Sequence, residues 1–383
     1  MPNVAAVVFE GGPAADEISR QMAIVRQAVV LDNLEKMASV AELDQIILCT
    51  DRPGLASEAA KLGATVDFDS GSRFQFGRRL AEVIRRYRLS RVIYMGGASA
   101  PLITREELAW IAQRLVTTDN VVIMNNVQSA DVVAFAPAKA IEMIGYPEND
   151  NFLGYLLREA GLERILIPNS SRVNFDLDTP NDLAILSLVP WTGPRTCRAL
   201  TQMPLDLSKL KAAQQVLRTK GAELGILGRV GAPVIAFINS NFAVRLRVFS
   251  EERGMKAMGR EEAGLVTSLI GRFIDEVGPV RFFDHLAGVV DAAFYDTRVY
   301  FAHLKKWPSD SDRFHSDLGD WEKIEDPQIR DFTRAAVEAP IPIVLGGHSL
   351  VAGGLWVLAE GTVLAEGREV RYLCDGVHKE KGV

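Results

Sequence analysis

The amino-terminal half of the chain alternates short runs of β-forming residues with segments in which apolar residues recur at helical spacing. Runs at 4–9, 45–49 and 91–95 have the length and composition of buried strands. Between the first two runs, the apolar residues of one helical face are Ile18, Met22, Val25 and Val29. This alternation predicts βαβ units, and therefore an α/β fold with a mostly parallel, Rossmann-like sheet.

Sheets of this kind bind ligands in the crevice outside the carboxyl ends of their strands. We expect further strands at 64–67, 121–124, 132–135 and 173–177. At the strand ends, the residues that we predict to bind a nucleotide are Gly11, Gly12, Thr50, Asp51, Gly96, Gly97 and Ser99. Glycines at such a turn let backbone N–H groups approach a phosphate closely.

A Pro- and Gly-containing stretch at 190–194 predicts a boundary between two domains, 1–190 and 200–383. In the second domain we expect a helix at 207–217, strands at 234–238 and 341–345, dominant helical spacing over 251–296 and a polar loop at 307–320. This mixture predicts an α+β or helix-rich domain, and its topology cannot be read from the pattern.

Charge, hydropathy and cysteine content narrow the class of protein. The formal net charge of −6 leaves no basic surface for a nucleic-acid backbone. No apolar run reaches the length of a membrane-spanning helix, and no signal peptide precedes the first strand. Cys49, Cys197 and Cys374 are far apart and lack zinc spacing, which favours free thiols and a cytoplasmic protein.

The segment 174–183 (NFDLDTPNDL) carries the most specific signal. Thr179 is a good helix N-cap, Pro180 suits the first helical position, and Asp182 follows the cap by three residues. The helix cap gives no role to Asp176 or Asp178. These two residues lie two positions apart at the end of a strand, so their side chains point to the same side. These two acids belong either to a metal or phosphate site or to the solvated start of the helix.

Read with the preceding pattern, this segment resembles nucleotidyltransferases of the molybdenum-cofactor guanylyltransferase and phospholactate guanylyltransferase type. The resemblance covers residues 3–188 and rests on the Asp-x-Asp-Thr-Pro pattern at 176–180. It implies a nucleotide-diphospho-sugar transferase fold, and Mg²⁺ held by Asp178 with Asp176 on a nucleoside triphosphate or nucleotide sugar. The implied reaction is nucleotidyl transfer to a phosphorylated or hydroxyl small-molecule acceptor, with release of pyrophosphate.

Two motifs of that family are altered here. The family's Ala-Gly-Gly loop with Arg-Met and a downstream Lys appears as Glu10-Gly11-Gly12, followed by Arg20 and no Lys before Lys36. We therefore assign Arg20, or Arg26 in its place, to the phosphates. The family's Gly-Asp-x-Pro-Leu motif is present at 96–102 as GGASAPL, without its acid. Loss of that ligand favours an alternative, a nucleotide-binding or regulatory protein that does not transfer.

A second alternative is a sugar-nucleotide glycosyltransferase. Asp67-Phe68-Asp69 is an Asp-x-Asp at a strand end, as in that class of enzyme, and basic residues follow it closely. Such a tripeptide also arises by chance, so it distinguishes the classes only weakly.

All five histidines lie in the second half. With their acidic neighbours, the candidates for a polar site are His285, His315, Asp317 and His348. None of the spacings is that of a metal motif, and a surface loop rich in Ser and Asp has the same composition. The run 346–354 (GGHSLVAGG) is similar to a hydrolase nucleophile elbow, but its glycines also suit an anion cradle or close helix–strand packing. The second domain would shape the acceptor site or mediate oligomerisation.

Overall fold

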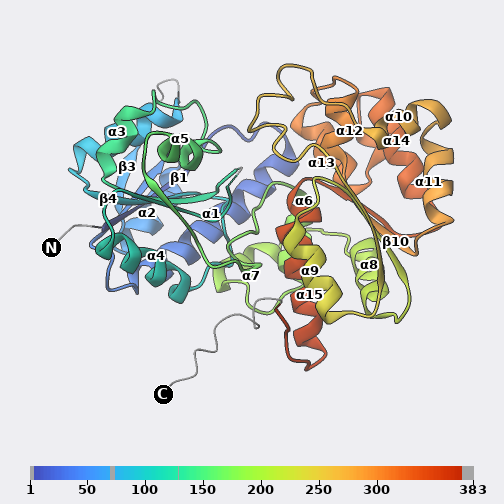
Figure 1. Ribbon diagram of the computed structural model, residues 1–383, viewed down its shortest axis with the longest axis horizontal. Coiled ribbons are helices and arrows are strands. Elements are labelled where there is room, and N and C mark those ends of the chain that lie inside the picture. Colours follow the sequence, from blue (N-terminus) through green and yellow to red (C-terminus); the bar gives the residue numbers. More distant parts are fainter. Residues whose placement is uncertain (1–3, 70–73, 128, 373–383) are drawn as a thin grey trace. The chain divides into compact units, whose positions relative to one another are not determined.

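The computed structural model describes residues 4–69, 74–127 and 129–372, and the chain divides into two compact units (Figure 1). The first unit comprises Met1–Leu177 and Trp191–Met203, and the second comprises Asp178–Pro190 and Pro204–Val383. The chain therefore passes between the units three times. Cys374 and His378 lie outside the described residues.

The first unit is built on a seven-stranded sheet with the order β3-β2-β1-β4-β6-β5-β7. Only β6 runs antiparallel to its neighbours. The strands are β1 (Val4–Glu10), β2 (Gln45–Thr50), β3 (Thr65–Phe68), β4 (Arg91–Gly96), β5 (Val121–Met124), β6 (Val132–Ala136) and β7 (Glu163–Leu166). The predicted α/β fold with a mostly parallel, Rossmann-like sheet is confirmed.

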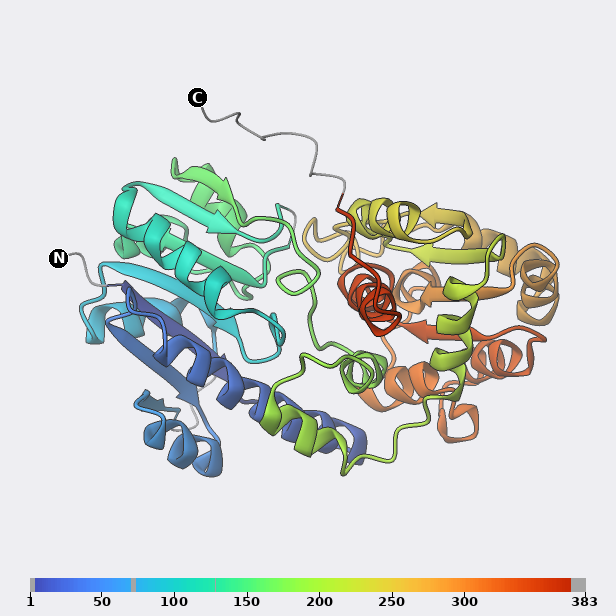
Figure 2. The same ribbon diagram turned by 90° about the horizontal axis from the view of Figure 1, so that it is seen from below.

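Helices cover both faces of this sheet. They are α1 (Glu17–Ala38), α2 (Pro53–Lys61), α3 (Phe76–Arg86), α4 (Arg105–Thr117), α5 (Leu153–Glu159), α7 (Pro194–Leu200) and the 3₁₀ helix η1 (Ala138–Met143). Side chains of α1, α2 and α4 form the core on one face, and those of α3, η1 and α5 form it on the other. Helix α7 returns from the chain's later part to lie beside α1 (Figure 2).

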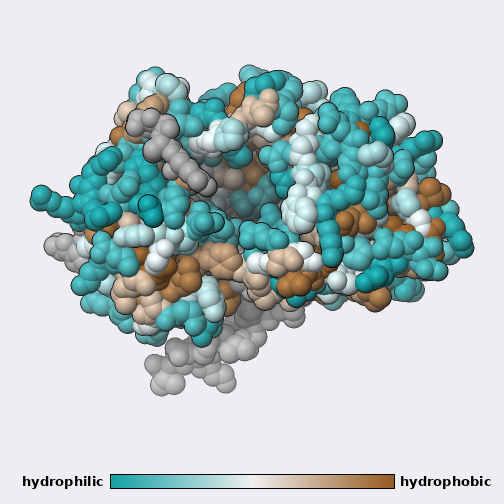
Figure 3. Space-filling model, turned by 90° about the horizontal axis from the view of Figure 1, so that it is seen from above, coloured by the Kyte–Doolittle hydropathy of each residue, from teal (hydrophilic) through white to brown (hydrophobic). Residues whose placement is uncertain are grey.

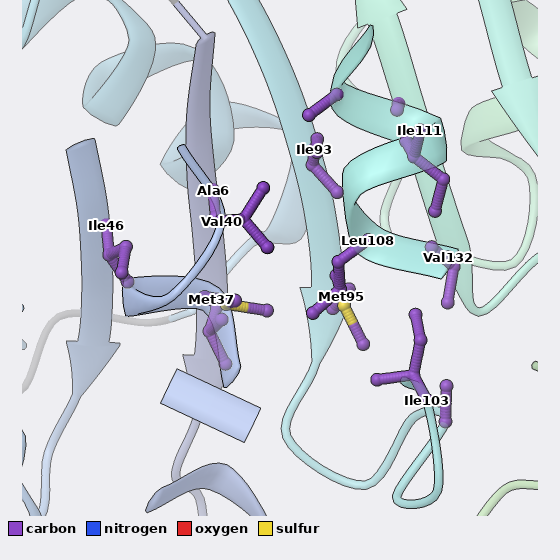
Figure 4. Close-up of a cluster of buried hydrophobic side chains, with 14 of the residues drawn as sticks. Ala6, Met37, Val40, Ile46, Ile93, Met95, Ile103, Leu108, Ile111 and Val132 are labelled. Carbon is purple, nitrogen blue, oxygen red and sulfur yellow. The ribbon is translucent and has the colours of Figure 1, made fainter. Parts of the chain in front are cut away.

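Strand β1 shows why its sequence is apolar throughout. Val4, Ala6 and Val8 face one core, whereas Ala5 and Val7 face the other, and all five are fully or almost fully buried. Successive side chains of a strand point to opposite faces, so a strand covered on both sides needs a continuous apolar run. Figure 4 shows the first of these cores, in which side chains of the sheet meet those of α4 and of the end of α1.

The second unit has a four-stranded parallel sheet with the order β11-β10-β8-β9. Its strands are β8 (Glu223–Gly228), β9 (Arg245–Ser250), β10 (Ala292–Asp296) and β11 (Ile343–Gly346). Its α-helices are α6 (Pro180–Ser187), α8 (Ser208–Arg218), α9 (Ala232–Asn241), α10 (Leu269–Val277), α11 (Pro279–Ala287), α12 (Thr297–His303), α13 (Asp310–Leu318), α14 (Pro327–Glu338) and α15 (Gly353–Ala365). Two 3₁₀ helices are η2 (Trp321–Lys323) and η3 (Ser349–Val351). The helix-rich character that the sequence predicted is confirmed, with a parallel sheet at the centre.

Four of the expected elements differ from the structure. Residues 292–296, at the end of the stretch expected to be helical, form strand β10, in which every residue is buried. Residues 234–238 form part of α9 and not a strand, because Gly231 caps a helix in which Val234, Phe237 and Ile238 are buried at helical spacing. Residues 310–318 form α13 and not a loop, because the Ser309 side chain accepts from the Asp312 N–H and Gly319 ends the helix with a φ of 79°. Residues 173–177 contain only an isolated bridge, between Asp176 and Ser99.

The polarity of the molecular surface is the one expected from the amino-acid composition. The face of the second unit seen in Figure 3 is mostly hydrophilic, with hydrophobic side chains in small separate groups. Within the described ranges, no helix has both the length and the apolarity needed to cross a membrane.

Candidate functional site

The carboxyl ends of β2, β1 and β4 meet at one edge of the first sheet, because these three strands are parallel neighbours. The structure places all seven predicted nucleotide-binding residues at the ends of these strands or in the loops that follow them: Gly11, Gly12, Thr50, Asp51, Gly96, Gly97 and Ser99. This clustering follows from parallel pairing alone, since parallel strands end on the same side.

The Gly11-Gly12 loop is held by the segment that follows β2. The Gly12 N–H donates to the Asp51 carboxylate at 3.2 Å, and the Arg52 guanidinium hydrogen-bonds the Gly12 carbonyl and pairs with Asp51 at 3.2 Å. A Cβ on Gly11 would lie 2.7 Å from the Asp51 Oδ1, so glycine is needed for this approach. A phosphate bound at Gly12 would have to replace the Asp51 carboxylate as acceptor.

Glu10 occupies the space beside Gly97. A Cβ on Gly97 would lie 2.1 Å from the Glu10 Oε2, and the Gly97 N–H donates to the Phe9 carbonyl at 2.8 Å. Burial raises the pKa of the Glu10 carboxyl, and Arg26, at 3.4 Å, acts in the opposite direction. The tip of β4 therefore has a carboxylate beside it, supplied by the end of β1.

Asp176 reaches the same edge through the chain that follows β7. It forms an antiparallel bridge with Ser99, and the Leu177 N–H donates to the Ala98 carbonyl at 3.2 Å. Asp150 also lies here, because its carboxylate accepts from the Tyr94 hydroxyl at 2.9 Å. Sequence reasoning missed Asp150, which sits in a turn without a motif.

The two remaining catalytic candidates lie in different settings. Arg20 is exposed on α1 and pairs with Glu17 at 2.9 Å, so Arg26 and Arg52 are the arginines in contact with the strand tips. Asp178 is an exposed residue and begins the second unit. Its backbone N–H donates to the Asp182 Oδ2 at 3.0 Å, as part of the start of α6.

Asp182 is the buried partner in this helix start. Thr179 and Asp182 form the predicted capping box, and the Asp182 Oδ2 also accepts from the Thr179 hydroxyl at 2.9 Å. Burial, and next the charge of Asp178, raise the pKa of Asp182 to about 7. The cap thus accounts for Asp182 and for the Asp178 backbone N–H, but it does not involve the Asp178 side chain.

The fit to Mg²⁺ is poor in the residues that the structure describes. Among them, no three His, Cys, Asp or Glu side chains are grouped so that they could hold a metal ion. The Asp-x-Asp at β3 is neutralised by arginines: Asp67 pairs with Arg79 at 3.1 Å and with Arg86, and Asp69 pairs with Arg79 at 2.6 Å. Neither the expected magnesium site nor a glycosyltransferase-type site is supported by these contacts.

The second unit has its own polar edge. Arg229, after β8, forms a two-pronged ion pair with Asp296 at the end of β10, with N···O distances of 2.5 and 3.0 Å. Arg298, after β10, forms another with Asp317 of α13, at 2.8 and 2.6 Å. All four residues are buried.

The four residues of the second unit that the sequence analysis proposed for a polar site lie in different surroundings. Asp317 belongs to the second ion pair, and His348 follows β11 at the same edge as Arg229. Loss of solvent, and next the positive charge of Arg229, lower the pKa of His348 to about 4. His285 stacks on Phe273 of α10, and His315 contacts Asp320 at 3.3 Å, so these two histidines serve local packing.

The solved structures that are similar to this protein cover about half of the chain. No protein-family model matches the sequence, and no curated protein matches it. A cytidylyltransferase from Leptospira borgpetersenii is 15% identical, with 49% of this chain and 87% of that chain covered and a TM-score of 0.40.

Two further solved structures are similar over nearly the same share. A 4-diphosphocytidyl-2C-methyl-D-erythritol synthase from Anaerococcus prevotii is 13% identical, with 47% and 92% of the chains covered and a TM-score of 0.34. A CMP:2-keto-3-deoxy-manno-octonic acid synthetase complexed with CTP is 12% identical, with 44% and 92% covered and a TM-score of 0.32. Scores of this size do not assign the chain to any of these families.

Proposed function

We propose that the first unit binds a nucleoside triphosphate or a nucleotide sugar at the carboxyl edge of its sheet. The observation that carries the proposal is the meeting of three loops at that edge, those after β1, β2 and β4. They bring the Gly11-Gly12 loop, where backbone can approach a phosphate, next to Arg26 and Arg52, with Gly96 and Gly97 at the neighbouring tip of β4.

As a nucleotidyltransferase, the protein transfers the nucleotidyl group of a nucleoside triphosphate to a phosphorylated or hydroxyl acceptor. An acceptor oxygen attacks the α-phosphorus, the bond from that phosphorus to the bridging oxygen breaks, and pyrophosphate leaves. A proton from a hydroxyl acceptor passes to solvent. Because the described residues do not form a magnesium site, we assign no step of this reaction to Mg²⁺.

A second candidate is a protein that binds the nucleotide without transferring it. It is favoured by the position of Glu10, whose carboxylate takes the space next to Gly97 and is paired with Arg26. A carboxylate that is buried and paired with an arginine is a poor ligand for a hard cation. The two candidates share the binding site and differ only in turnover.

Calorimetric titration of the full chain with ATP, GTP, CTP and UTP, each with and without Mg²⁺, tests binding. The sharpest variant is Asp51→Asn, which removes the negative charge at the Gly12 N–H and keeps the side-chain shape. We expect it to bind the preferred nucleotide about tenfold more tightly, since a like charge next to the phosphates is removed. Glu163→Gln, at the amino end of β7, is the matched control.

Pyrophosphate release in the presence of candidate acceptors then separates the two functions. Release supports the transferase, and binding without release over a wide set of acceptors supports the non-transferring protein. Absence of binding by all four nucleoside triphosphates and by the corresponding nucleotide sugars, in both the wild type and Asp51→Asn, would refute both.

A further inference from the structure

The order of the second sheet identifies a place where a ligand would bind. The chain runs from β8 to β9 on one side, and then crosses β8 to reach β10 and β11 on the other. The strands β8 and β10 are therefore neighbours whose connections leave in opposite directions. In open parallel sheets the ligand binds outside the carboxyl ends of the strands at such a switch point.

The loop after β11 presents unused hydrogen-bond donors at this edge. No described residue accepts a hydrogen bond from the backbone N–H of Gly347, His348 or Ser349, whereas the N–H groups of Val351 and Ala352 close the turn of η3. Gly347 and Ser349 are buried. Buried N–H groups without an acceptor are rare in folded proteins, and consecutive N–H groups form a typical anion-binding concavity.

The loop after β9 supplies a guanidinium with no acidic partner. Among the described residues, Arg253 forms no ion pair, and its Nε is buried without a hydrogen-bond acceptor. By contrast, the charges of Arg229 and Arg298 are balanced by Asp296 and Asp317. Arg253 is therefore the arginine of this edge whose charge is available to a ligand.

These loops lie close to one another. The Gly231 N–H, after β8, donates to the Val351 carbonyl at 3.3 Å, which ties the β8 loop to the β11 loop. The Ser250 hydroxyl, at the end of β9, donates to the Val230 carbonyl at 3.1 Å, and the Glu251 N–H donates to the Gly228 carbonyl at 3.0 Å. The loop that carries Arg253 and the loop that carries residues 347–349 thus both contact the β8 loop, and the charge of Arg253 acts on His348.

We propose that the second unit binds a phosphate group of a small molecule at this switch point, held by Arg253 and by the backbone N–H groups of Gly347, His348 and Ser349. This site is separate from the nucleotide site proposed for the first unit and does not depend on it. A phosphate dianion matches both kinds of donor, because charge-assisted hydrogen bonds from guanidinium and N–H groups are the strong ones.

His348 would report the binding of this anion. The groups that act on its charge are Arg229 and Arg253, which disfavour the imidazolium, and Asp296 and Asp178, which favour it. A bound dianion adds negative charge near the ring, so the pKa of His348 should rise from about 4 when phosphate binds. The titration of the His348 ring signals in NMR spectra should therefore move to higher pH when phosphate is added.

Calorimetric titration of the full chain with inorganic phosphate at about pH 8, where the free ligand is mainly the dianion, tests the proposal. We expect Arg253→Gln to weaken phosphate binding by about tenfold or more. Because Arg253 forms no ion pair with any residue that the structure describes, this variant strands no acidic partner and should fold. Arg245→Gln, at the exposed amino end of β9, is the matched control and should bind like the wild type.

Hydrogen exchange of the same complexes locates the ion. Slower exchange at 347–349 on addition of phosphate supports the site, and the Arg253→Gln variant should lose that protection. Equal phosphate affinity of Arg253→Gln and the wild type, or protection confined to the loops of the first unit, would overturn the proposal. Phosphate binding that leaves the titration of the His348 ring unchanged would remove His348 from it.

Discussion

At the scale of single residues, two buried titratable groups of the second unit have opposite effects on stability. The pKa of Asp182 is raised from 3.8 to about 7, first by burial, and that of His348 is lowered from 6.5 to about 4, also first by loss of solvent. The folded chain therefore holds the Asp182 proton more tightly, and the His348 proton less tightly, than the unfolded chain does.

The direction of each pH dependence follows from the linkage between proton binding and folding. The contribution of Asp182 to the free energy of unfolding falls as the pH rises from about 4 to about 7, by up to about 4 kcal/mol. The contribution of His348 rises between about pH 4 and 6.5, by up to about 3 kcal/mol. In the wild type these two contributions to the free energy of unfolding largely cancel. We expect the free energy of unfolding of Asp182→Asn to increase with pH more steeply than that of the wild type. For His348→Gln we expect the free energy of unfolding to decrease as the pH rises.

Denaturant unfolding at a series of pH values between 4 and 8 measures both slopes. Above pH 7 the differences from the wild type should become constant. Curves for the two variants that run parallel to the wild type would show that neither group titrates in this range in the folded chain.

Gly97 gives a second prediction at this scale. Gly97→Ala places a methyl group on the Glu10 carboxylate, so we expect a loss of about 1–3 kcal/mol in the free energy of unfolding and weaker nucleotide binding. Gly54→Ala, where a Cβ meets nothing within 4 Å, is the control and should be neutral or slightly stabilising. Combining Gly97→Ala with Glu10→Ala should recover part of the loss, and purely additive effects would contradict the direct contact.

At the scale of elements, the ends of the parallel strands carry the charged groups. Burial alone would raise the pKa of Asp296 at the tip of β10, but the Arg229 guanidinium outweighs it and the pKa is lowered. The pair links the end of β8 to the end of β10, and Gly228 is required there because a Cβ would lie 2.6 Å from the Asp296 Cβ. Strand pairing and ion pairing thus support each other at this edge.

Asp296→Asn should test this link. The substitution leaves Arg229 buried without its counter-ion, so we expect the free energy of unfolding to fall by about 3–5 kcal/mol. Arg245→Gln breaks the exposed pair with Glu223 at the opposite end of the sheet and should cost less than about 1 kcal/mol. Chemical denaturation measures both, and equal losses would show that the buried pair has no special weight.

At the scale of the whole molecule, helix α6 belongs to the second unit although it precedes α7 of the first unit in the chain. Leu183, Ile185 and Leu186 of α6 are buried, and α6 packs with α13 and α15. The Asn181 side chain donates to the carbonyls of Asp317 and Leu345 at 2.7 and 2.6 Å. The second unit is thus incomplete without residues 178–190.

Two fragments test this organisation. We expect residues 178–383 to fold as a soluble fragment with a cooperative unfolding transition. Residues 200–383 should be unstable or aggregate, because the apolar surface that α6 covers would be exposed. Circular dichroism and thermal unfolding compare them, and equal stability of the two fragments would mean that α6 contributes little.

Much of the first unit could be predicted from local patterns. The strands at 4–9, 45–49, 91–95, 121–124 and 132–135 were placed within a residue of their observed bounds, because continuous apolar runs between turn residues are characteristic of doubly covered parallel sheets. Local patterns predict less of the secondary structure of the second unit. Its apolar run at 234–238 suits a strand or a buried helix equally, and only the Gly231 cap and the packing of α9 decide between them.

The sequence by itself determined the alternation of strands and helices, the cap at Thr179 and the loops at the strand ends, because these depend on residues close together in the chain. Only the tertiary structure decided that Glu10 fills the space at Gly97, that Arg229 meets Asp296 and that Arg253 forms no ion pair within the described ranges. Such contacts join residues that are distant in the chain, so no local pattern of spacing or composition records them.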